Sequence, residues 1–531
     1  MKIERSLAAL LAGWLLLAVA CIWLRPLWPV DETRYASVAW EMWQRGDFLV
    51  PYVNGEPYSH KPPLLFWLIQ AGWALFGVND WWPRLVGPLC ALAAVPLTLR
   101  LGRLLWPGER EAGETAVWVL FGTLLFAAFI TLTMFDLLLL DCALAGMVGV
   151  QSLVQGRRIS GLLWLGAGIG LGVLAKGPVI LLHVLPAAVA APWWAPQLKG
   201  RLVRWYRDLL LGVLLGAAIA LAWALPAGWL GGEQYRQAIF WGQTAGRVAE
   251  SFAHRAPFWY YLPFLPLILF PWLVWPGFWK GIAAAGLREA GVKFLLAWLL
   301  LTLLGFSLVS GKQAKYLVPF LPSFALLAGY ALTRAAAVAR AWEMLPPALG
   351  FLAAAVLLGV LRADPARLRQ PEWVGEIPPW PLFLLALVAP ILLVLGRMET
   401  LKQVRALSFA VLAAFAIGFA GVIPAFVPYG DPGPTARHLA DLQARRVPLA
   451  HLGKYHAQYN FAGRLREPIE ILDHQEVREW VRTHPDGELI TVERSRAAAG
   501  NPRPDYEVPF RGAWLQVWKG PDLLQARPDL R

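Results

Sequence analysis

Residues 31–63 read DETRYASVAWEMWQRGDFLVPYVNGEPYSHKPP, and the organisation of the whole chain follows from this stretch. It lies between two strongly apolar segments, yet acidic and basic side chains occur along it from Asp31 to Lys61. Ionisable groups held beside a bilayer are costly, so they indicate a functional site unless the stretch is a solvated loop between two helices. Arg34 and Lys61 are suited to bind a phosphate. Asp31 or Glu32 is suited to take a proton or to orient an acceptor.

The composition excludes a soluble globular protein, because 58% of the 531 residues are hydrophobic and only 16% are charged. A net charge of +13 would indicate a nucleic-acid partner in a soluble protein. Here the basic residues lie in short loops between apolar runs, where they set membrane topology, and no nucleic acid is expected. The three cysteines all lie in apolar runs, so neither a disulfide framework nor a thiolate metal site is indicated. The glycine run 166–172 also lies inside an apolar run without a preceding strand, which favours close helix packing over a nucleotide-binding loop.

Apolar runs long enough to cross ~30 Å of hydrocarbon recur along most of the chain. The first run follows Lys2 and Arg5 and is expected to be a retained anchor rather than a cleaved signal peptide. The run 63–78 is too short to span and is expected to form an interfacial or re-entrant helix. We expect about thirteen membrane spans, at residues 6–24, 84–105, 115–133, 137–154, 161–174, 178–195, 208–228, 258–278, 292–310, 316–333, 346–361, 380–396 and 406–427.

Alternate loops between these spans are short and rich in Arg and Lys, whereas the intervening loops are longer and mixed in charge. The positive-inside rule therefore places the N-terminus in the cytoplasm, and an odd number of spans places the C-terminus outside. After the last span the composition changes, with prolines and glycines at 428–434. Alternating runs at 468–472, 488–492 and 513–518 predict strands, and 473–483 predicts a helix. We expect a transmembrane domain at 1–427, with an outer juxtamembrane loop and helices at 31–80, and a small α/β domain at 428–531.

This topology gathers further charged residues on the outer face. Asp136 follows the third span, Lys176 lies in LAKGP, and Lys312 and Lys315 lie in GKQAKY. His254 precedes Arg255 in a fifth loop. Taken singly, Asp136 is equally suited to cap a helix, and each lysine is equally suited to snorkel at a helix end. Together they indicate a site for an anionic substrate at the outer membrane surface.

Several motifs resemble the polyprenyl-phosphate-sugar glycosyltransferases of the GT-C fold. These are the opening stretch extended to Trp67, FGVNDWWPRL, LAKGP, HRAPFWYYLP and GKQAKYLVPFLPSFALL, in that order along the chain. The most similar branch is the aminoarabinose transferases of lipid A, bacterial relatives of the protein O-mannosyltransferases. The resemblance is strongest over residues 25–330 and looser over KYHAQYNFAGRL and EPIEIL near the C-terminus. It implies a polytopic α-helical protein of the bacterial inner membrane, with about thirteen spans, periplasmic juxtamembrane helices and a periplasmic C-terminal α/β domain.

The resemblance also implies roles for individual residues. Asp31 and Asp136 would be the essential outer-loop acids, and Lys61 would meet the donor phosphate with Arg34 close by. The chemistry of the step, apart from the resemblance, adds Glu32 as another candidate catalytic acid and Lys176 or Lys312 as further cations for the phosphate.

The resemblance implies a metal site, at a position where this chain departs from the family pattern. The family commonly has Glu before Lys-Pro-Pro, and in the aminoarabinose branch this Glu helps to hold a metal with a His that matches His254. Here His60 occupies the Glu position, and a His60–His254 pair would still suit zinc or another divalent cation. The departure leaves the class of acceptor open.

The function expected from these features is inverting glycosyl transfer. A sugar, aminoarabinose or another monosaccharide, would move from an undecaprenyl-phosphate carrier to an acceptor on the periplasmic side, lipid A or another envelope glycolipid. No nucleotide is needed, because the leaving group is a lipid phosphate. The alternatives are a protein O-mannosyltransferase-type enzyme and a polytopic lipid transporter or flippase. A transporter predicts inverted repeats and mid-membrane charges, and the sequence shows neither.

Overall fold

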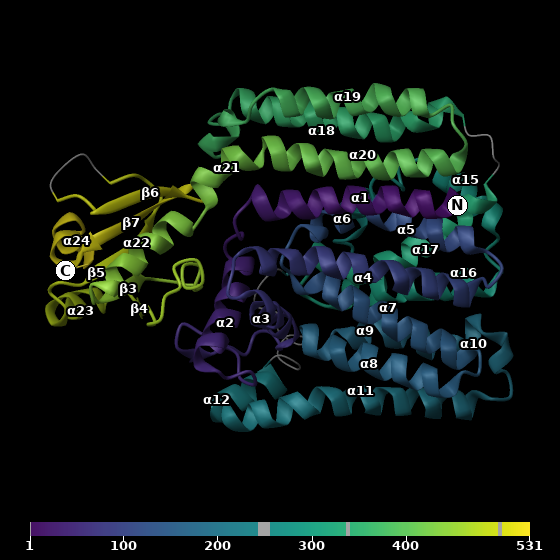
Figure 1. Ribbon diagram of the computed structural model, residues 1–531, viewed down its shortest axis with the longest axis horizontal. Helices are drawn as coiled ribbons and strands as arrows, with labels where there is room; N and C mark the ends of the chain where they lie inside the picture. The colour runs from purple at the N-terminus through teal and green to yellow at the C-terminus, as the bar shows by residue number, and fades with distance from the viewer. Residues whose placement is uncertain (1, 243–254, 336–339, 498–501, 531) are drawn as a thin grey trace.

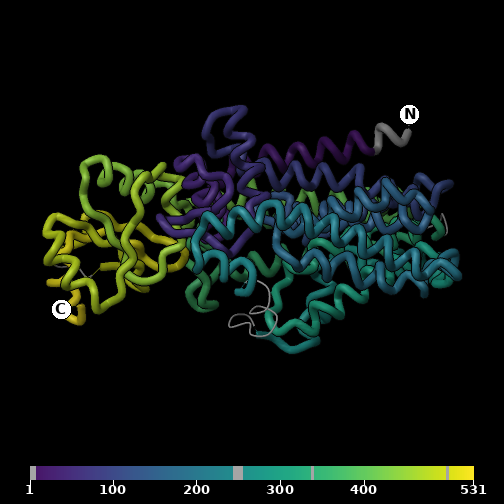
Figure 2. The backbone as a smooth tube through the Cα atoms, turned by 90° about the horizontal axis from the view of Figure 1, so that it is seen from below, coloured from purple at the N-terminus to yellow at the C-terminus, as the bar shows by residue number. Residues whose placement is uncertain are grey.

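The computed structural model describes residues 2–242, 255–335, 340–497 and 502–530. Long helices lie side by side in a bundle, and a small domain with a sheet lies at one end of it (Figure 1). We call this end of the bundle the domain end. The N-terminus lies at the opposite end in both Figure 1 and Figure 2, so the chain crosses the bundle an odd number of times.

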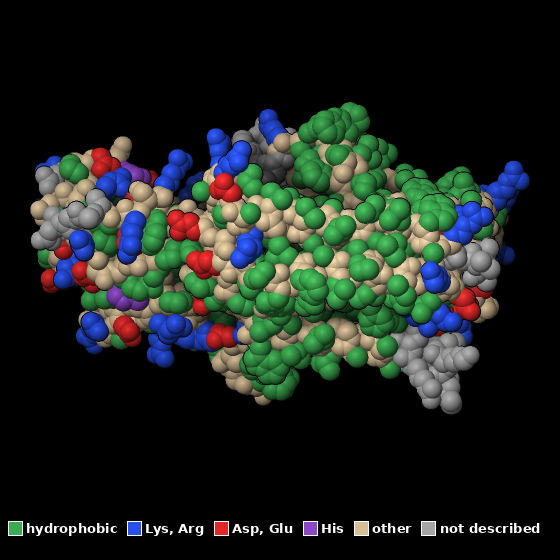
Figure 3. All heavy atoms as spheres, turned by 90° about the horizontal axis from the view of Figure 1, so that it is seen from above, with side chains coloured by type: hydrophobic (Ala, Val, Ile, Leu, Met, Phe, Trp, Pro, Cys, Tyr) green, Lys and Arg blue, Asp and Glu red, His purple; other side chains and the backbone are tan. Residues whose placement is uncertain are grey.

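The surface of the bundle agrees with a membrane location. Hydrophobic side chains cover the middle of the molecule, and basic and acidic side chains gather towards its two ends (Figure 3). The bundle helices are α1 (Lys2–Trp23), α4 (Trp81–Leu105), α5 (Arg110–Phe121), α6 (Leu124–Ile130), α7 (Phe135–Val154), α8 (Arg158–Lys176), α9 (Ile180–Val189), α10 (Ala191–Trp194), α11 (Leu202–Leu230), α15 (Pro276–Ala285), α16 (Ala290–Leu308), α17 (Leu321–Arg334), α18 (Leu345–Ala363), α19 (Trp380–Leu395) and α20 (Thr400–Gly421).

Eight of the expected spans coincide with helices that are long and apolar enough to cross a membrane, within the described ranges. A ninth is the pair α5 and α6, bent by 70° where Gly122 packs against Ser408 of α20. The spans expected at 6–24, 178–195 and 380–396 fall on shorter apolar helices. The total of thirteen therefore stays a prediction that agrees with the positions of the two termini.

The run expected as one span at 258–278 is not a single helix, and this part of the prediction was wrong. Only α14 (Leu265–Ile268) and the start of α15 are α-helical there. Prolines recur through this run, at Pro263, Pro266, Pro271 and Pro276. Each lacks a backbone N–H, which prevents a continuous helix even where every residue is apolar.

Helix α7 forms the centre of the bundle, and 89% of its apolar segment is buried. It packs closely against α8 because glycines remove side chains from the contact. A Cβ atom built on Gly149 would lie 2.4 Å from the backbone nitrogen of Leu165, and one on Gly168 would lie 2.4 Å from that of Gly146. The predicted packing role of the 166–172 glycines is therefore confirmed for Gly168. The antiparallel pair sets the start of α7 beside the end of α8.

The juxtamembrane elements lie between the bundle and the small domain (Figure 1). They are α2 (Asp31–Arg45), the hairpin of β1 (Tyr52–Val53) and β2 (Glu56–Pro57), and α3 (Leu64–Phe76). Helix α2 lies across the bundle helices at their domain end. It stops at Gly46, whose φ of 65° is a conformation that glycine adopts without strain. Helix α3 occupies the run that was expected to be too short to span.

The C-terminal domain is a five-stranded mixed sheet with helices. The strand order is β4-β3-β5-β7-β6, in which β3 pairs in parallel with β4 and β5, and β7 pairs antiparallel with β5 and β6. Strands β4, β5 and β7 and helix α23 fall within or overlap the four segments predicted there, whereas β3 and β6 were not predicted. Helix α21 (Ile423–Gly430) runs across the expected domain boundary, so that boundary stays a prediction. The elements are α22 (Gly433–Ala444), β3 (Leu449–Leu452), β4 (Glu470–Leu472), α23 (Val477–Thr483), β5 (Glu488–Glu493), β6 (Tyr506–Phe510), β7 (Ala513–Lys519) and α24 (Gly520–Ala526).

Candidate functional site at the domain end of the bundle

Asp136 and Lys176 form a buried ion pair where α7 begins and α8 ends. The Lys176 Nζ lies 2.5 Å from Asp136 Oδ1, and the exposed fractions of the two side chains are 9% and 1%. An acid in the first turn of a helix and a cation in the last turn each interact favourably with the helix dipole. The packing of α7 on α8 therefore places two complementary charges together, and both were predicted site residues.

A second, more exposed group of charges consists of Asp31, Arg34 and Lys315, and we call it the open cluster. Asp31 lies in the first turn of α2, 2.5 Å from the Nη2 atom of Arg34 one turn further on. Lys315, in the 3₁₀ helix η4 (Ala314–Phe320), places its Nζ 3.6 Å from Asp31 Oδ2. These side chains are 19–38% exposed, so solvent and substrate have access. The buried Nε of Arg34 makes no hydrogen bond within the described residues. Two cations on one carboxylate leave an excess of positive charge that suits an anion.

Aromatic side chains connect the two clusters. The Lys61 Nζ lies 5.9 Å from the centre of the Phe135 ring, next to Asp136 in the chain. The Lys176 Nζ lies 5.3 Å from the ring of Tyr316, next to Lys315. Tyr35 of α2 meets Phe135 edge to face at 4.8 Å. Lys61 therefore lies near the same group of residues, as predicted.

Tyr35 lies among these charges as a neutral group. Burial raises the pKa of its phenol, and the nearby Asp31 carboxylate raises this pKa further. The phenol therefore stays protonated at physiological pH and retains a hydrogen to donate.

Glu32 is placed differently from its neighbour Asp31. It is 2% exposed, and its Oε2 accepts hydrogen bonds from Arg25 at 2.5 Å and from the backbone N–H of Trp28 at 2.6 Å. Its Oε1 accepts from Arg25 at 2.9 Å and from the backbone N–H of Thr133 at 2.5 Å. Arg25 also donates to the carbonyl of Thr131. With both oxygens occupied, Glu32 fixes α2 to the loop that presents Asp136, and we infer a positioning role for it.

Arg25 was not selected from the sequence. A single arginine after an apolar run is the normal pattern at a span end, and its pairing with Glu32 is visible only in the fold.

Lys312 does not join the charged clusters. It is 4% exposed, and its Nζ donates to the carbonyls of Val309 at 2.6 Å and Ala256 at 2.9 Å. It therefore ties the end of α16 to the segment after residue 254. Lys315, three residues further on, contacts Asp31 instead. The predicted motif supplies a cation to the site, but from Lys315 rather than Lys312.

Of the two histidines proposed to bind a metal, only His60 lies among the residues that the structure describes. His60 is exposed, with its ring 5.3 Å from that of Tyr58. His254 lies outside the described residues, whereas its neighbour Arg255 pairs with Gly311 as an isolated bridge. Within the described ranges, no group of three or more His, Cys, Asp and Glu side chains is arranged to hold a metal ion. The His60–His254 hypothesis stays a prediction.

The C-terminal domain docks on α2 through the loop that contains KYHAQYNFAGRL. The Ser37 hydroxyl donates to the carbonyl of Ala457 at 2.7 Å and accepts from the backbone N–H of Phe461 at 3.0 Å. The Phe461 ring stacks on Trp73 of α3 at 5.1 Å. Because Ser37 lies one turn beyond Arg34, this loop stabilises the part of α2 that carries the open cluster.

His456 of the same loop adds a titratable group beside that cluster. Its side chain is exposed next to Ala457. Partial burial lowers its pKa, as do the cations of Arg34 and Lys454 nearby. The loop therefore adds an imidazole at the edge of the cluster, which sequence reasoning had not selected.

Comparisons with known proteins agree with this architecture. Residues 60–227 match the family described as dolichyl-phosphate-mannose-protein mannosyltransferase. A Pseudomonas aeruginosa protein named undecaprenyl phosphate-alpha-4-amino-4-deoxy-L-arabinose arabinosyl transferase is 30% identical, with 91% of this chain and 93% of the relative covered. A Pseudomonas fluorescens protein of the same name, numbered 1, is 33% identical over 59% of this chain and 56% of the relative. The crystal structure of ArnT from Cupriavidus metallidurans bound to undecaprenyl phosphate has a TM-score of 0.77, with 20% identity and 97% of both chains covered.

Proposed function

The chain belongs to the undecaprenyl phosphate-aminoarabinose arabinosyl transferase family and is a polytopic membrane glycosyltransferase, and we propose that it transfers aminoarabinose from an undecaprenyl-phosphate carrier to lipid A. The observation that carries this proposal is the open cluster, in which Asp31 is flanked by Arg34 and Lys315 at the domain end of the bundle. A cationic site at the end of apolar helices suits a substrate with a phosphate head and a long lipid tail.

Positive charge is what the leaving group requires. The donor phosphodiester already carries one negative charge, and it becomes a phosphate monoester with a second charge as the sugar leaves. We infer that Arg34, Lys61 and Lys315 stabilise that developing charge, because cations held in a partly buried site act more strongly than in water. The electron pair of the broken sugar–oxygen bond goes to the phosphate.

The acceptor oxygen forms the new bond to the anomeric carbon. Attack from the face opposite the departing phosphate inverts the anomeric configuration in a single displacement. If the acceptor is a hydroxyl group, Asp31 is suited to accept its proton. If it is a phosphate of lipid A, the oxygen is already anionic, and Asp31 and Asp136 orient the two substrates instead. Neither course uses a metal, and zinc at His60 and His254 would add electrophilic stabilisation beside the phosphate.

We place the N-terminus in the cytoplasm and the C-terminal domain in the periplasm. The support is the distribution of basic residues at the end of the bundle away from the domain, such as Arg157 between α7 and α8 and Arg158 at the start of α8. Single cysteines at Asn54 and at Arg158 should react oppositely with a membrane-impermeant thiol reagent in intact cells. The three native cysteines are buried, so their own labelling should be low. Labelling of both positions from outside would contradict this orientation.

A protein hydroxyl is the second candidate acceptor, because the mannosyltransferase family match covers residues 60–227. The decisive experiment reconstitutes the purified chain in liposomes with an undecaprenyl-phosphate-linked aminoarabinose donor and no nucleotide sugar. Lipid A and a serine- and threonine-rich protein are supplied as competing acceptors. We expect labelled lipid A. Transfer to the protein alone would favour the second candidate, and no transfer from this donor would refute the proposal.

A further inference from the structure

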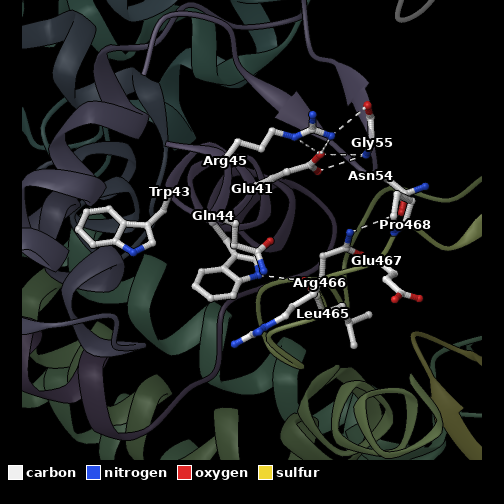
Figure 4. Close-up of a pocket in the computed structure, with 12 residues that line it drawn as sticks. Glu41, Trp43, Gln44, Arg45, Asn54, Gly55, Leu465, Arg466, Glu467 and Pro468 are labelled. Atoms are coloured by element: carbon white, nitrogen blue, oxygen red, sulfur yellow. Dashed lines mark hydrogen bonds and ion pairs between the residues drawn. The ribbon is translucent and has the colours of Figure 1, made fainter. Parts of the chain in front are cut away.

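A cleft of about 570 Å³ lies apart from the charged clusters, between the C-terminal half of α2, the β1–β2 hairpin and the segment before β4 (Figure 4). Asp31, Arg34, Lys61 and Asp136 do not line it. Its volume is in the range of small-molecule binding sites. The juxtamembrane elements supply one wall of the cleft and the C-terminal domain supplies the other.

The walls of the cleft are fixed by hydrogen bonds. Glu41 accepts from Arg45 at 2.8 Å and from the backbone N–H of Gly55 at 3.0 Å. Asn54 donates to the carbonyl of Ile469 at 2.8 Å and accepts from its N–H at 2.9 Å. The Trp40 indole donates to the carbonyl of Leu465 at 3.1 Å. Sites held in this way lose little entropy when a ligand binds.

Other lining side chains keep their polar atoms unused. The indole N–H of Trp43, the amide of Gln44, the guanidinium of Arg466 and the carboxylate of Glu467 make no hydrogen bond or ion pair within the parts of the chain that are described. Figure 4 shows Gln44 on α2 and Arg466 and Glu467 on the C-terminal segment, with the ring of Trp43 set apart to the left of them. They offer both donors and acceptors, beside the indole rings of Trp40 and Trp43.

This combination matches the chemistry of a sugar ring. Sugar hydroxyls both donate and accept hydrogen bonds, and the C–H faces of a sugar pack on aromatic rings. A lipid tail would leave these polar atoms unpaired. A free phosphate would favour unopposed cations, but Arg45 is paired with Glu41 and Arg466 has Glu467 beside it in the chain.

We propose that this cleft binds a sugar ring of the glycan acceptor, away from the ring or phosphate that reacts. The inference rests on the proposed function for the identity of the acceptor. Arg34 and Trp43 lie nine residues apart on α2, which is ~14 Å along a helix. The acceptor would have to be longer than one sugar, such as two linked sugars with a terminal phosphate, to occupy the cleft and reach the open cluster. Binding at such a distance positions the reacting group.

The test uses the full-length chain in detergent and measures binding of a fluorescent glucosamine disaccharide, the deacylated backbone of lipid A, with and without its phosphates. The double variant Gln44→Ala/Arg466→Gln should bind the unphosphorylated disaccharide at least ~10-fold more weakly than the wild type. The matched control, Gln475→Ala/Arg478→Gln, changes two exposed residues of the same types near or in α23 and should bind like the wild type.

Three results would overturn the inference: no binding of the unphosphorylated form by the wild type, equal binding by the double variant, or equal loss in the control. The binding assay needs no turnover. A chain that binds the disaccharide but transfers no aminoarabinose would therefore contradict the proposed function alone. In the transfer assay the double variant should raise KM for the acceptor and leave KM for the donor unchanged, which a general loss of structure would not produce.

Discussion

Replacing Asp136 by Asn should lower both stability and activity. The two effects can be separated by also replacing Lys176. The ion pair is almost fully buried, with exposed fractions of 1% and 9%. Removing the carboxylate leaves a buried ammonium group without its counter-charge. Breaking one partner of such a pair costs about 3–5 kcal/mol of folding free energy. Asp136→Asn should therefore lower the apparent melting temperature of the purified protein clearly.

The compensating variant is Asp136→Asn/Lys176→Met. It removes both charges and keeps a side chain of similar length against α7. Replacing a buried pair with well-packed uncharged residues is often neutral for stability, so the melting temperature should return close to the wild-type value. Transfer should not return, because the proposed role of Asp136 requires its carboxylate, and a loss of roughly 10²-fold or more is expected.

Thermal unfolding in detergent and initial transfer rates on the same preparations measure the two effects. An Asp136→Asn variant that melts like the wild type would contradict the stabilising role of the ion pair. Recovery of stability and activity together in the double variant would show that Asp136 serves the fold alone.

Four further predictions follow from individual residues. Glu32→Gln should lower the melting temperature by disturbing a buried ion pair, whereas Asp31→Asn, at a partly exposed carboxylate, should leave it unchanged; thermal scans compare them. Lys61→Ala should weaken binding of undecaprenyl phosphate about 10-fold by removing a cation, and equal binding in a titration would contradict its role. If zinc is bound, elemental analysis should find less of it in His60→Ala than in the wild type, and equal content would refute the metal hypothesis. Burial lowers the pKa of His451 to about 4, below the ~6.5 of an unfolded chain. Stability should thus be full above pH ~6.5 and fall by on the order of 3 kcal/mol towards pH 4. His451→Gln should make stability less dependent on pH, measured as the hydrogen-exchange protection of the β3 amides at each pH.

The sequence predicted most of the architecture because a membrane imposes simple rules. The length of an apolar run indicates a helix, and the basic loops indicate its direction. These rules found eight long helices, the short α3 and the mixed domain after the bundle. They failed at 258–278. This run is apolar enough to be predicted as a span, but its prolines interrupt helical hydrogen bonding.

The site was predictable as a set of charges but not as a set of contacts. Asp31, Arg34, Asp136 and Lys176 were selected correctly as neighbours of one face, since topology alone brings their loops together. Which lysine reaches Asp31 depends on the turn of η4, and a spacing of three residues separates Lys315 from Lys312. Such details are set by tertiary packing.

Contacts between residues far apart in the sequence, which fix the geometry of the site, could not be predicted for the same reason. Glu32 meets Thr133 across 101 residues, and Ser37 meets Ala457 across 420. Nothing in the local pattern of α2 distinguishes Asp31, which stays accessible, from the buried Glu32 beside it.

The central claim is that the open cluster around Asp31 is where the sugar leaves undecaprenyl phosphate. The most direct test is a single-turnover measurement of undecaprenyl phosphate released from the labelled donor in the presence of acceptor. Asp31→Asn should slow this release by roughly 10²-fold or more. The matched control is Asp47→Asn, an acid of the same juxtamembrane stretch that accepts backbone hydrogen bonds from Leu49 and Val50. We predict wild-type release in the control and loss in Asp31→Asn; equal release by Asp31→Asn and the wild type would contradict the account.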